Sequence, residues 1–323
     1  MRVWKAGPLI LIVGLVVACH RSPTEPDEFP DPSAGPILLG TIGNGVTLST
    51  LIEIDPLTGA TLNIIGPVGF VVNGMEFDAT TGTLYGSTGK RDPTYNGLIT
   101  IDLVTGAGTP IHTTSGFGWG VPEAINNITI DASGQLYGWW EPAEDDLMKI
   151  DKVTGIATRV GESDPNDTGF GTMNGGLDFD NSGILYVNRS FPPDFHTVNL
   201  VSGAVTFAGT VTPDDFLFVH HGDFHPGTNV LYALSDQFEP SNLLLVDVTI
   251  LANVTTFTGI SVIPLEDDVH VITWGPGAPE PGEECPKSAN SSKSRKSDQS
   301  DKSDKSGSSG KSTNSGKSGT CPS

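Results

Sequence analysis

The sequence predicts an all-β protein, a β-propeller with five four-stranded blades. A short phrase, Ile or Val followed by Asp or Asn, recurs along the chain at Asp55, Asp102, Asp151, Asn199 and Asp247. In four of the five copies, Thr-Gly or Ser-Gly follows it. These positions are 47, 49, 48 and 48 residues apart, and the copy at Asp247 has lost its Thr-Gly. A period of this length is typical of an array of identical units, and four strands fit into one unit.

A second phrase, Leu-Tyr, lies between the copies of the first. Its tyrosines are Tyr85, Tyr137, Tyr186 and Tyr232. In the unit that spans residues 174–211, four short stretches of alternating apolar and polar residues are separated by Asn, Asp, Ser and Gly. This alternation is typical of strands, and the intervening residues favour chain reversal. Each unit therefore predicts one blade.

The Asp-x-x-Thr-Gly phrase predicts a tight turn between two strands. An Asp side chain can cap its own turn, and Gly adopts the left-handed conformation without a steric penalty. We expect these Asp and Gly residues to be structural and not to form a calcium loop.

The two ends of the repeat array predict how the propeller closes. Four complete units begin near residues 73, 126, 174 and 220. Before them, residues 36–42, 49–54 and 60–66 supply three strands, and after them residues 270–274 supply one. Three plus one strands make a fifth blade, and such closure removes open sheet edges. We expect one propeller domain over residues 36–276, large enough for a substantial core.

The Leu-Tyr and Ile-Asp-x-x-Thr-Gly phrases resemble the repeats of secreted bacterial propellers, broadly the quinoprotein-like and YVTN-like group. The resemblance covers residues 36–275 and implies the fold, not an activity. Quinoprotein dehydrogenases typically carry a Trp several residues after the Thr-Gly. This chain has none there, so we expect no quinone cofactor and transfer no active-site residue.

The N-terminal segment predicts export. Arg2 and Lys5 precede an apolar run from residue 9 to residue 18 that is too short to span a bilayer comfortably, so residues 1–18 are typical of a signal peptide. The run ends in Val-Val-Ala-Cys19, which resembles the lipobox of bacterial lipoproteins and implies lipidation of Cys19. His20 follows where an inner-membrane signal would place Asp, which favours the outer membrane or cell surface. Residues 19–35 are expected to form a Pro-rich tether.

The C-terminal residues 277–323 are rich in Ser, Lys and Gly, and are expected to be disordered. Cys285 and Cys321 flank most of this tail, and an oxidising compartment would allow them to form a disulfide. The tail could lie against an anionic polymer or against its own propeller, or serve as a solvated spacer.

Charge limits the partners of the domain. Residues 20–276 hold 32 acidic and 7 basic residues, whereas residues 277–323 hold 6 acidic and 8 basic residues. So acidic a body disfavours nucleic acid, and it permits divalent cations, basic partners or neutral glycans.

Polar residues at the start of each innermost strand form the candidate binding site. These residues and the aromatic residues of the adjoining loops are Asn73, Asn126, Asn174, His220, His221, His270, Trp119, Phe170 and Trp140. Amides, imidazoles and aromatic rings around a channel mouth suit a sugar or another neutral polar ligand. The alternative is that the aromatic rings pack between blades and the Asn side chains cap loops.

The stretch from His220 to His225 is rich in potential metal ligands. His220 and His225 would lie about 16 Å apart on a strand and cannot share an ion. His221 and Asp223 point to the same side but would need ligands from another blade. In the repeat alignment, Asp223 falls with Glu76, Thr129 and Asp178 in a column that is merely polar, and His225 falls at a turn. We therefore expect no metal site and no cofactor, although a divalent cation is compatible with the charge.

No Gly-x-Ser-x-Gly or His-Glu-x-x-His motif is present. The sequence favours a monomeric, non-catalytic envelope module that binds a glycan or a protein. The alternatives are a polysaccharide hydrolase or lyase with its site at the channel mouth, and an envelope assembly scaffold.

Overall fold

In the computed structural model, every regular element among the described residues is a β-strand. The structure describes residues 35–43, 47–89, 91–112, 119, 124–141, 145–163, 175–189, 194–212, 219–235, 241–251 and 254–276. The expected signal peptide, lipobox, most of the tether, and the tail lie outside these residues, as do Cys19, Cys285 and Cys321. In the described part of the chain, no helix is long and apolar enough to cross a membrane.

The strands form five blades of four antiparallel strands, which confirms the predicted fold. The first blade contains β1 (Ile37–Ile42), β2 (Thr50–Ile54), β3 (Thr61–Pro67) and β20 (Val269–Gly275). The second contains β4 (Val72–Asp78), β5 (Thr83–Thr88), β6 (Leu98–Ile101) and β7 (Gly108–Pro110). The third contains β8 (Ala124–Ile130), β9 (Leu136–Glu141), β10 (Asp146–Ile150) and β11 (Ala157–Arg159).

The fourth blade contains β12 (Leu177–Phe179), β13 (Leu185–Arg189), β14 (Asp194–Val198) and β15 (Val205–Thr212). The fifth contains β16 (Gly222–Phe224), β17 (Val230–Ser235), β18 (Asn242–Leu251) and β19 (Val254–Pro264). The last two blades also join at their outer edge, where β15 and β19 pair in parallel over two residues, so that together they form one eight-stranded sheet.

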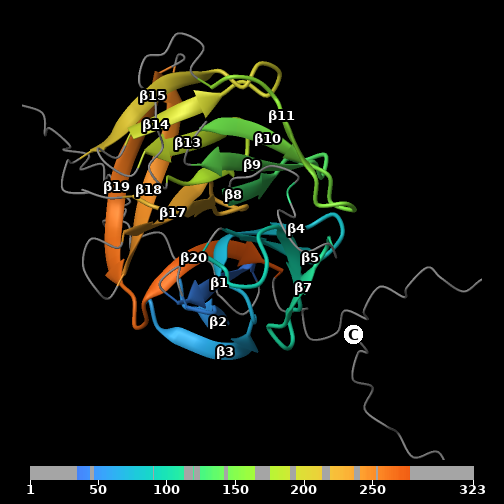
Figure 1. The fold of residues 1–323 in the computed structure, drawn as a ribbon. Coiled ribbons are helices and arrows are strands. Elements are labelled where there is room, and N and C mark those ends of the chain that lie inside the picture. The colour runs from blue at the N-terminus through green and yellow to red at the C-terminus, as the bar shows by residue number, and fades with distance from the viewer. Residues whose placement is uncertain are drawn as a thin grey trace, which may run out of the picture.

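The 3+1 closure is also as predicted. The C-terminal strand β20 pairs antiparallel with β1, with Gly275 opposite Ile37 and Trp274 opposite Leu38. The five innermost strands β4, β8, β12, β16 and β20 contact one another in a closed ring. Figure 1 shows β4, β8 and β20 near the middle of the molecule and β3, β15 and β19 at its periphery.

The repeated turn has the predicted conformation. Asp102 Oδ1 accepts hydrogen bonds from the amides of Val104 and Thr105, and Gly106 has a φ of 77°. At the first copy, a Cβ on Gly59 would collide with the Pro264 carbonyl of the fifth blade. Gly therefore provides both the left-handed turn and the close approach of neighbouring blades.

The hydrophobic core lies between blades as well as within them. One cluster combines Leu38 and Trp274 of the first blade with Tyr232, Leu243 and Leu245 of the fifth. Because each blade packs on the next in this way, the ring holds the inner strands in fixed positions around the channel.

Candidate functional site

One position on each inner strand carries a polar side chain that belongs to a common ring around the channel. The five residues of this channel ring are Glu76, Thr129, Asp178, Asp223 and Thr273. They are the aligned polar column of the repeats together with its counterpart on β20. Because the inner strands are arranged in a circle, residues far apart in sequence meet at one level of the channel.

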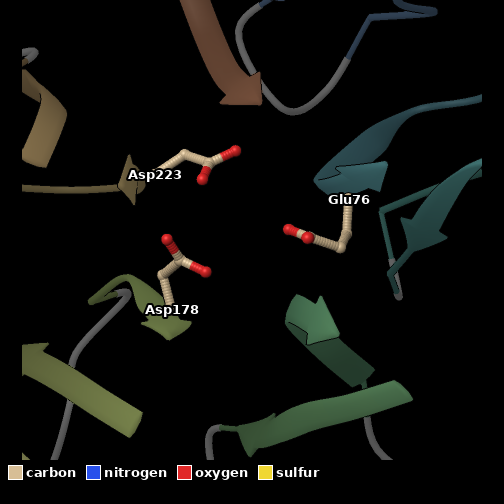
Figure 2. A group of neighbouring side chains, drawn as sticks. All are labelled: Glu76, Asp178 and Asp223. Atoms are coloured by element: carbon tan, nitrogen blue, oxygen red, sulfur yellow. The ribbon is translucent and has the colours of Figure 1, made fainter. Parts of the chain in front are cut away.

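Three members of the channel ring are acidic and converge. One carboxylate oxygen from each of Glu76, Asp178 and Asp223 lies within 4.8 Å of the other two. Figure 2 shows the three side chains pointing toward a common centre from three different strands. Asp178 and Asp223 are each 8% exposed, and Glu76 is partly buried.

Hydrogen bonds between blades hold these carboxylates in place. Asp178 accepts from the backbone amide of Phe224 at 2.6 Å, and Asp223 accepts from that of Trp274 at 2.8 Å. Glu76 accepts from the amide of Ile130. Each carboxylate therefore accepts a hydrogen bond from a backbone amide of the next blade, that of the residue directly after the channel-ring position. This regular pattern orients the three carboxylates toward the channel axis.

The two Thr residues of the channel ring adjoin the carboxylates. The Thr129 hydroxyl donates to Asp178 Oδ1 at 2.8 Å. Thr273 is fully buried, and its Oγ1 completes no hydrogen bond of standard geometry within the described part of the chain. It lies close enough to Asp223 to lower the pKa of that carboxyl.

The pKa values of all three carboxyl groups lie above their usual range. Burial is the first cause in each case, because it removes hydration from the charged form. The charge of Asp223 raises the pKa values of Glu76 and Asp178 further. The three groups titrate together, and either protonation or a positive charge among them would relieve their mutual repulsion.

A cavity of about 670 Å³ opens at this level of the channel, and the three carboxylates line it. Its other lining includes Phe77, Phe179 and Trp274, and the turns that leave the inner strands contribute Ala132 and Pro226. No Lys, Arg or His belongs to its lining among the described residues. The cavity therefore has an acidic floor and is bordered by aromatic residues that also pack in the cores between blades.

The cavity lies at the opposite end of the inner strands from the binding site that the sequence predicted. At the predicted end, Asn73 Nδ2 donates to Asn126 Oδ1 at 3.3 Å, so these two side chains do meet across blades. The rings of His221 and His270 also meet, with centroids 5.6 Å apart. Burial, followed by the charges of His270 and His220, holds the pKa of His221 well below its usual value.

The predicted aromatic residues occupy different environments. Trp119 is fully buried, and its Nε1 donates to Asn96 Oδ1 at 3.1 Å. Trp140 is partly buried against the same apolar cluster as Trp119. Asn174 and Phe170 lie outside the described residues. Ligand binding by the predicted set stays a prediction.

The acidic cluster was not predicted from the sequence, although Glu76, Asp178 and Asp223 fall in one column of the repeats. Residues that share one column of the repeat alignment lie at the same level on successive blades. Because the blades close into a ring, these residues surround the channel and meet across it. Asp223 thus finds its acidic neighbours on other blades, not His221 on its own strand. His225 caps a turn as predicted, since its Nδ1 accepts from the amides of Gly227 and Thr228.

The fold and the channel ring define this protein as a five-bladed β-propeller with an acidic channel. The sequence matches no protein-family model and no curated protein. Among solved structures, it is similar to a chain of the nidogen/laminin complex, with 14% identity and a TM-score of 0.47 over 75% of this chain and 98% of that chain.

Two bacterial structures show comparable similarity. A gluconolactonase from Xanthomonas campestris has 14% identity and a TM-score of 0.43, over 76% of this chain and 84% of its own. An auxiliary nutrient binding protein from Bacteroides thetaiotaomicron has 15% identity and a TM-score of 0.41, over 69% and 48%. None of these similarities is close enough to support a functional assignment.

Proposed function

We propose that this protein is an exported, lipid-anchored propeller that acts as a non-catalytic binding module, and that the channel cavity is its binding site for a neutral glycan segment. The cavity carries this proposal, because its 670 Å³ is within the usual range for small-ligand sites. The apolar residues at its border suit the apolar faces of sugar rings, and its carboxylates can accept hydrogen bonds from hydroxyl groups.

The charge of the cavity selects against acidic ligands. An acidic sugar would meet Glu76, Asp178 and Asp223 with no basic side chain in the described lining to pair with it. The strongly acidic body of the chain adds to this repulsion. A neutral glycan avoids the penalty, and for the same reason the proposal includes no nucleic acid partner.

The binding proposal is tested by comparing two matched Trp variants, in the presence of a chelator, on an array of neutral and uronate-containing oligosaccharides. Ala132 is exposed in a turn that lines the cavity, and Ala107 is exposed in a turn that does not. We expect Ala132→Trp to weaken binding of a neutral oligosaccharide at least about 10-fold by obstructing the cavity, and Ala107→Trp to leave it unchanged. Equal binding by both variants, or preference for uronates, would refute the assignment.

A second candidate function is hydrolysis or lyase cleavage of a polysaccharide at the same cavity. Carboxyl groups with raised pKa values are suited to donate or accept protons near neutral pH, and glycosidases use pairs of carboxyl groups about 5 Å apart or more. Release of shortened products from a bound oligosaccharide, lost in Asp178→Asn, would favour this enzyme over the binding module.

The proposal also includes the cellular location of the protein. We propose that Cys19 is acylated and that residues 19–35 tether a monomeric propeller to the outer membrane or cell surface, where it binds its glycan. An envelope protein as partner, or a role as an assembly scaffold, remains the alternative to a glycan.

The Cys19→Ala variant should move the protein from the membrane fraction to the soluble exported fraction, because acyl chains provide about 0.8 kcal/mol of membrane affinity per buried methylene. Cell fractionation followed by immunoblotting measures this change, and Cys285→Ala is the matched control that should stay with the membrane. Continued sedimentation of Cys19→Ala with membranes would exclude the lipid anchor.

A further inference from the structure

The acidic cluster has no positive counter-charge within the described part of the chain. The ion pairs found there join other residues, such as Lys152 with Asp78 and Arg159 with Asp146. Three carboxylates crowded into a span of 4.8 Å repel one another strongly, and water screens them little because two of them are more than nine-tenths buried. Such a cluster is either partly protonated or neutralised by a bound cation.

Thr273 supplies a second, independent indication of a ligand. Its side chain is fully buried at the same level of the channel, beside Asp223, yet Oγ1 completes no standard hydrogen bond within the described residues. A buried hydroxyl that lacks a full hydrogen bond is unfavourable. A ligand in the channel would satisfy it, either directly or through a coordinated water.

We propose that Glu76, Asp178 and Asp223 bind a divalent cation, Ca²⁺, at the floor of the channel cavity. The ligands are all oxygen atoms, which Ca²⁺ prefers, and the cluster contains no His or Cys that would favour zinc. An ion at the centre of three oxygens that lie within 4.8 Å of one another is at most about 2.8 Å from each, and small side-chain movements would bring it to the usual Ca²⁺–oxygen distance of about 2.3–2.6 Å.

The protein supplies only part of the coordination shell of the proposed ion, so that other ligands can reach the ion. Ca²⁺ takes six to eight oxygen ligands, and three carboxylates with the Thr273 hydroxyl leave positions for water or for ligand oxygens. These positions face the cavity, because all three carboxylates line it. The site goes beyond the proposed binding of a glycan, since the ion can be held whether or not a glycan occupies the cavity.

Calorimetric titration of the full chain in detergent with CaCl₂, at about 150 mM NaCl, tests the site. We expect the binding of one ion per chain, because the described residues hold one such cluster of three carboxylates. Glu76→Gln should weaken binding at least about 10-fold, since one of three charges is lost while the side chain keeps its length. Thr273→Val should weaken binding to a smaller degree.

Glu53→Gln is the matched control, since Glu53 is a partly buried strand residue outside the acidic cluster. It should leave Ca²⁺ affinity unchanged. The site is refuted by the absence of binding at millimolar Ca²⁺, or by equal affinity of the wild type and Glu76→Gln. Equal weakening by Glu53→Gln and Glu76→Gln would also refute it, because binding would then reflect the overall charge of the domain.

Discussion

Replacing Asp223 with Asn is expected to stabilise the cation-free protein and to abolish its stabilisation by Ca²⁺. Asn has nearly the same shape and can still accept the hydrogen bond from the Trp274 amide. It removes the charge that raises the pKa values of Glu76 and Asp178. We expect the free energy of unfolding in chelator at pH 7 to rise by about 1–3 kcal/mol. For a domain of this size, the melting temperature should then rise by about 2–12 °C.

The pH dependence follows from the direction of the pKa shifts. A carboxyl whose pKa is raised in the folded state binds more protons when folded than when unfolded, where its pKa is about 4. The free energy of unfolding of the cation-free wild type should therefore fall as pH rises from about 4 through the raised folded-state values. In Asp223→Asn this decline should be smaller, and saturating Ca²⁺ should remove it only in the wild type.

Asp78, which also lies on an inner strand, is the control for Asp223, because its pKa is shifted in the opposite direction. It is fully buried, and burial alone would raise its pKa, but the Lys152 ammonium and the Thr80 hydroxyl outweigh that effect and hold the pKa far below its usual range. Its stabilising effect is present above about pH 4 and is lost as pH falls. Asp78→Asn should thus destabilise the protein where Asp223→Asn stabilises it. Thermal unfolding across pH 4–8 measures both, and destabilisation by Asp223→Asn in chelator would contradict our interpretation of the cluster.

Truncation of the chain after Asp268 is expected to abolish cooperative folding. It removes β20, the innermost strand of the first blade, and with it the buried Val269, Val271, Ile272 and Trp274. Burying each of these side chains contributes about 1.5–3 kcal/mol. The sum is comparable with the entire stability of a typical domain, about 5–15 kcal/mol. Circular dichroism melting should show no cooperative transition.

Two control variants distinguish the loss of ring closure from a general effect of shortening the chain. Deletion of residues 286–323 should leave the melting temperature nearly unchanged, because the strands that close the ring remain. A permuted chain in which residues 269–276 precede residue 35 through a short Gly linker should fold, since Gly275 already lies opposite Ile37. Cooperative melting of the chain that ends at Asp268 would show that β20 is dispensable for closure.

Most of the fold could be predicted from the sequence because the repeats record it directly. The spacing of Asp55, Asp102 and Asp151 gave the blade length, and the lone strand near His270 gave the 3+1 closure that the structure confirms. The parallel pairing of β15 with β19 was not predicted, since it depends on the length of two outer strands and not on the repeat.

The candidate site was predicted less well, because residue type alone does not reveal which ends of the strands enclose a cavity. The binding site was predicted at the start of the inner strands because histidine is a common ligand residue and His220, His221 and His270 lie there. Glu76, by contrast, lies far from Asp178 and Asp223 in the sequence, and it gains these partners only when β4, β12 and β16 are arranged around one axis.

The most direct test of the acidic channel as a cation site is anomalous diffraction from crystals grown with CaCl₂. The structure predicts a single strong peak between the side chains of Glu76, Asp178 and Asp223, at about 2.3–2.6 Å from an oxygen atom of each. Crystals of the Asp223→Asn variant should lose this peak. A channel with no anomalous peak in the wild type, or a peak only at surface carboxylates, would contradict the proposed site.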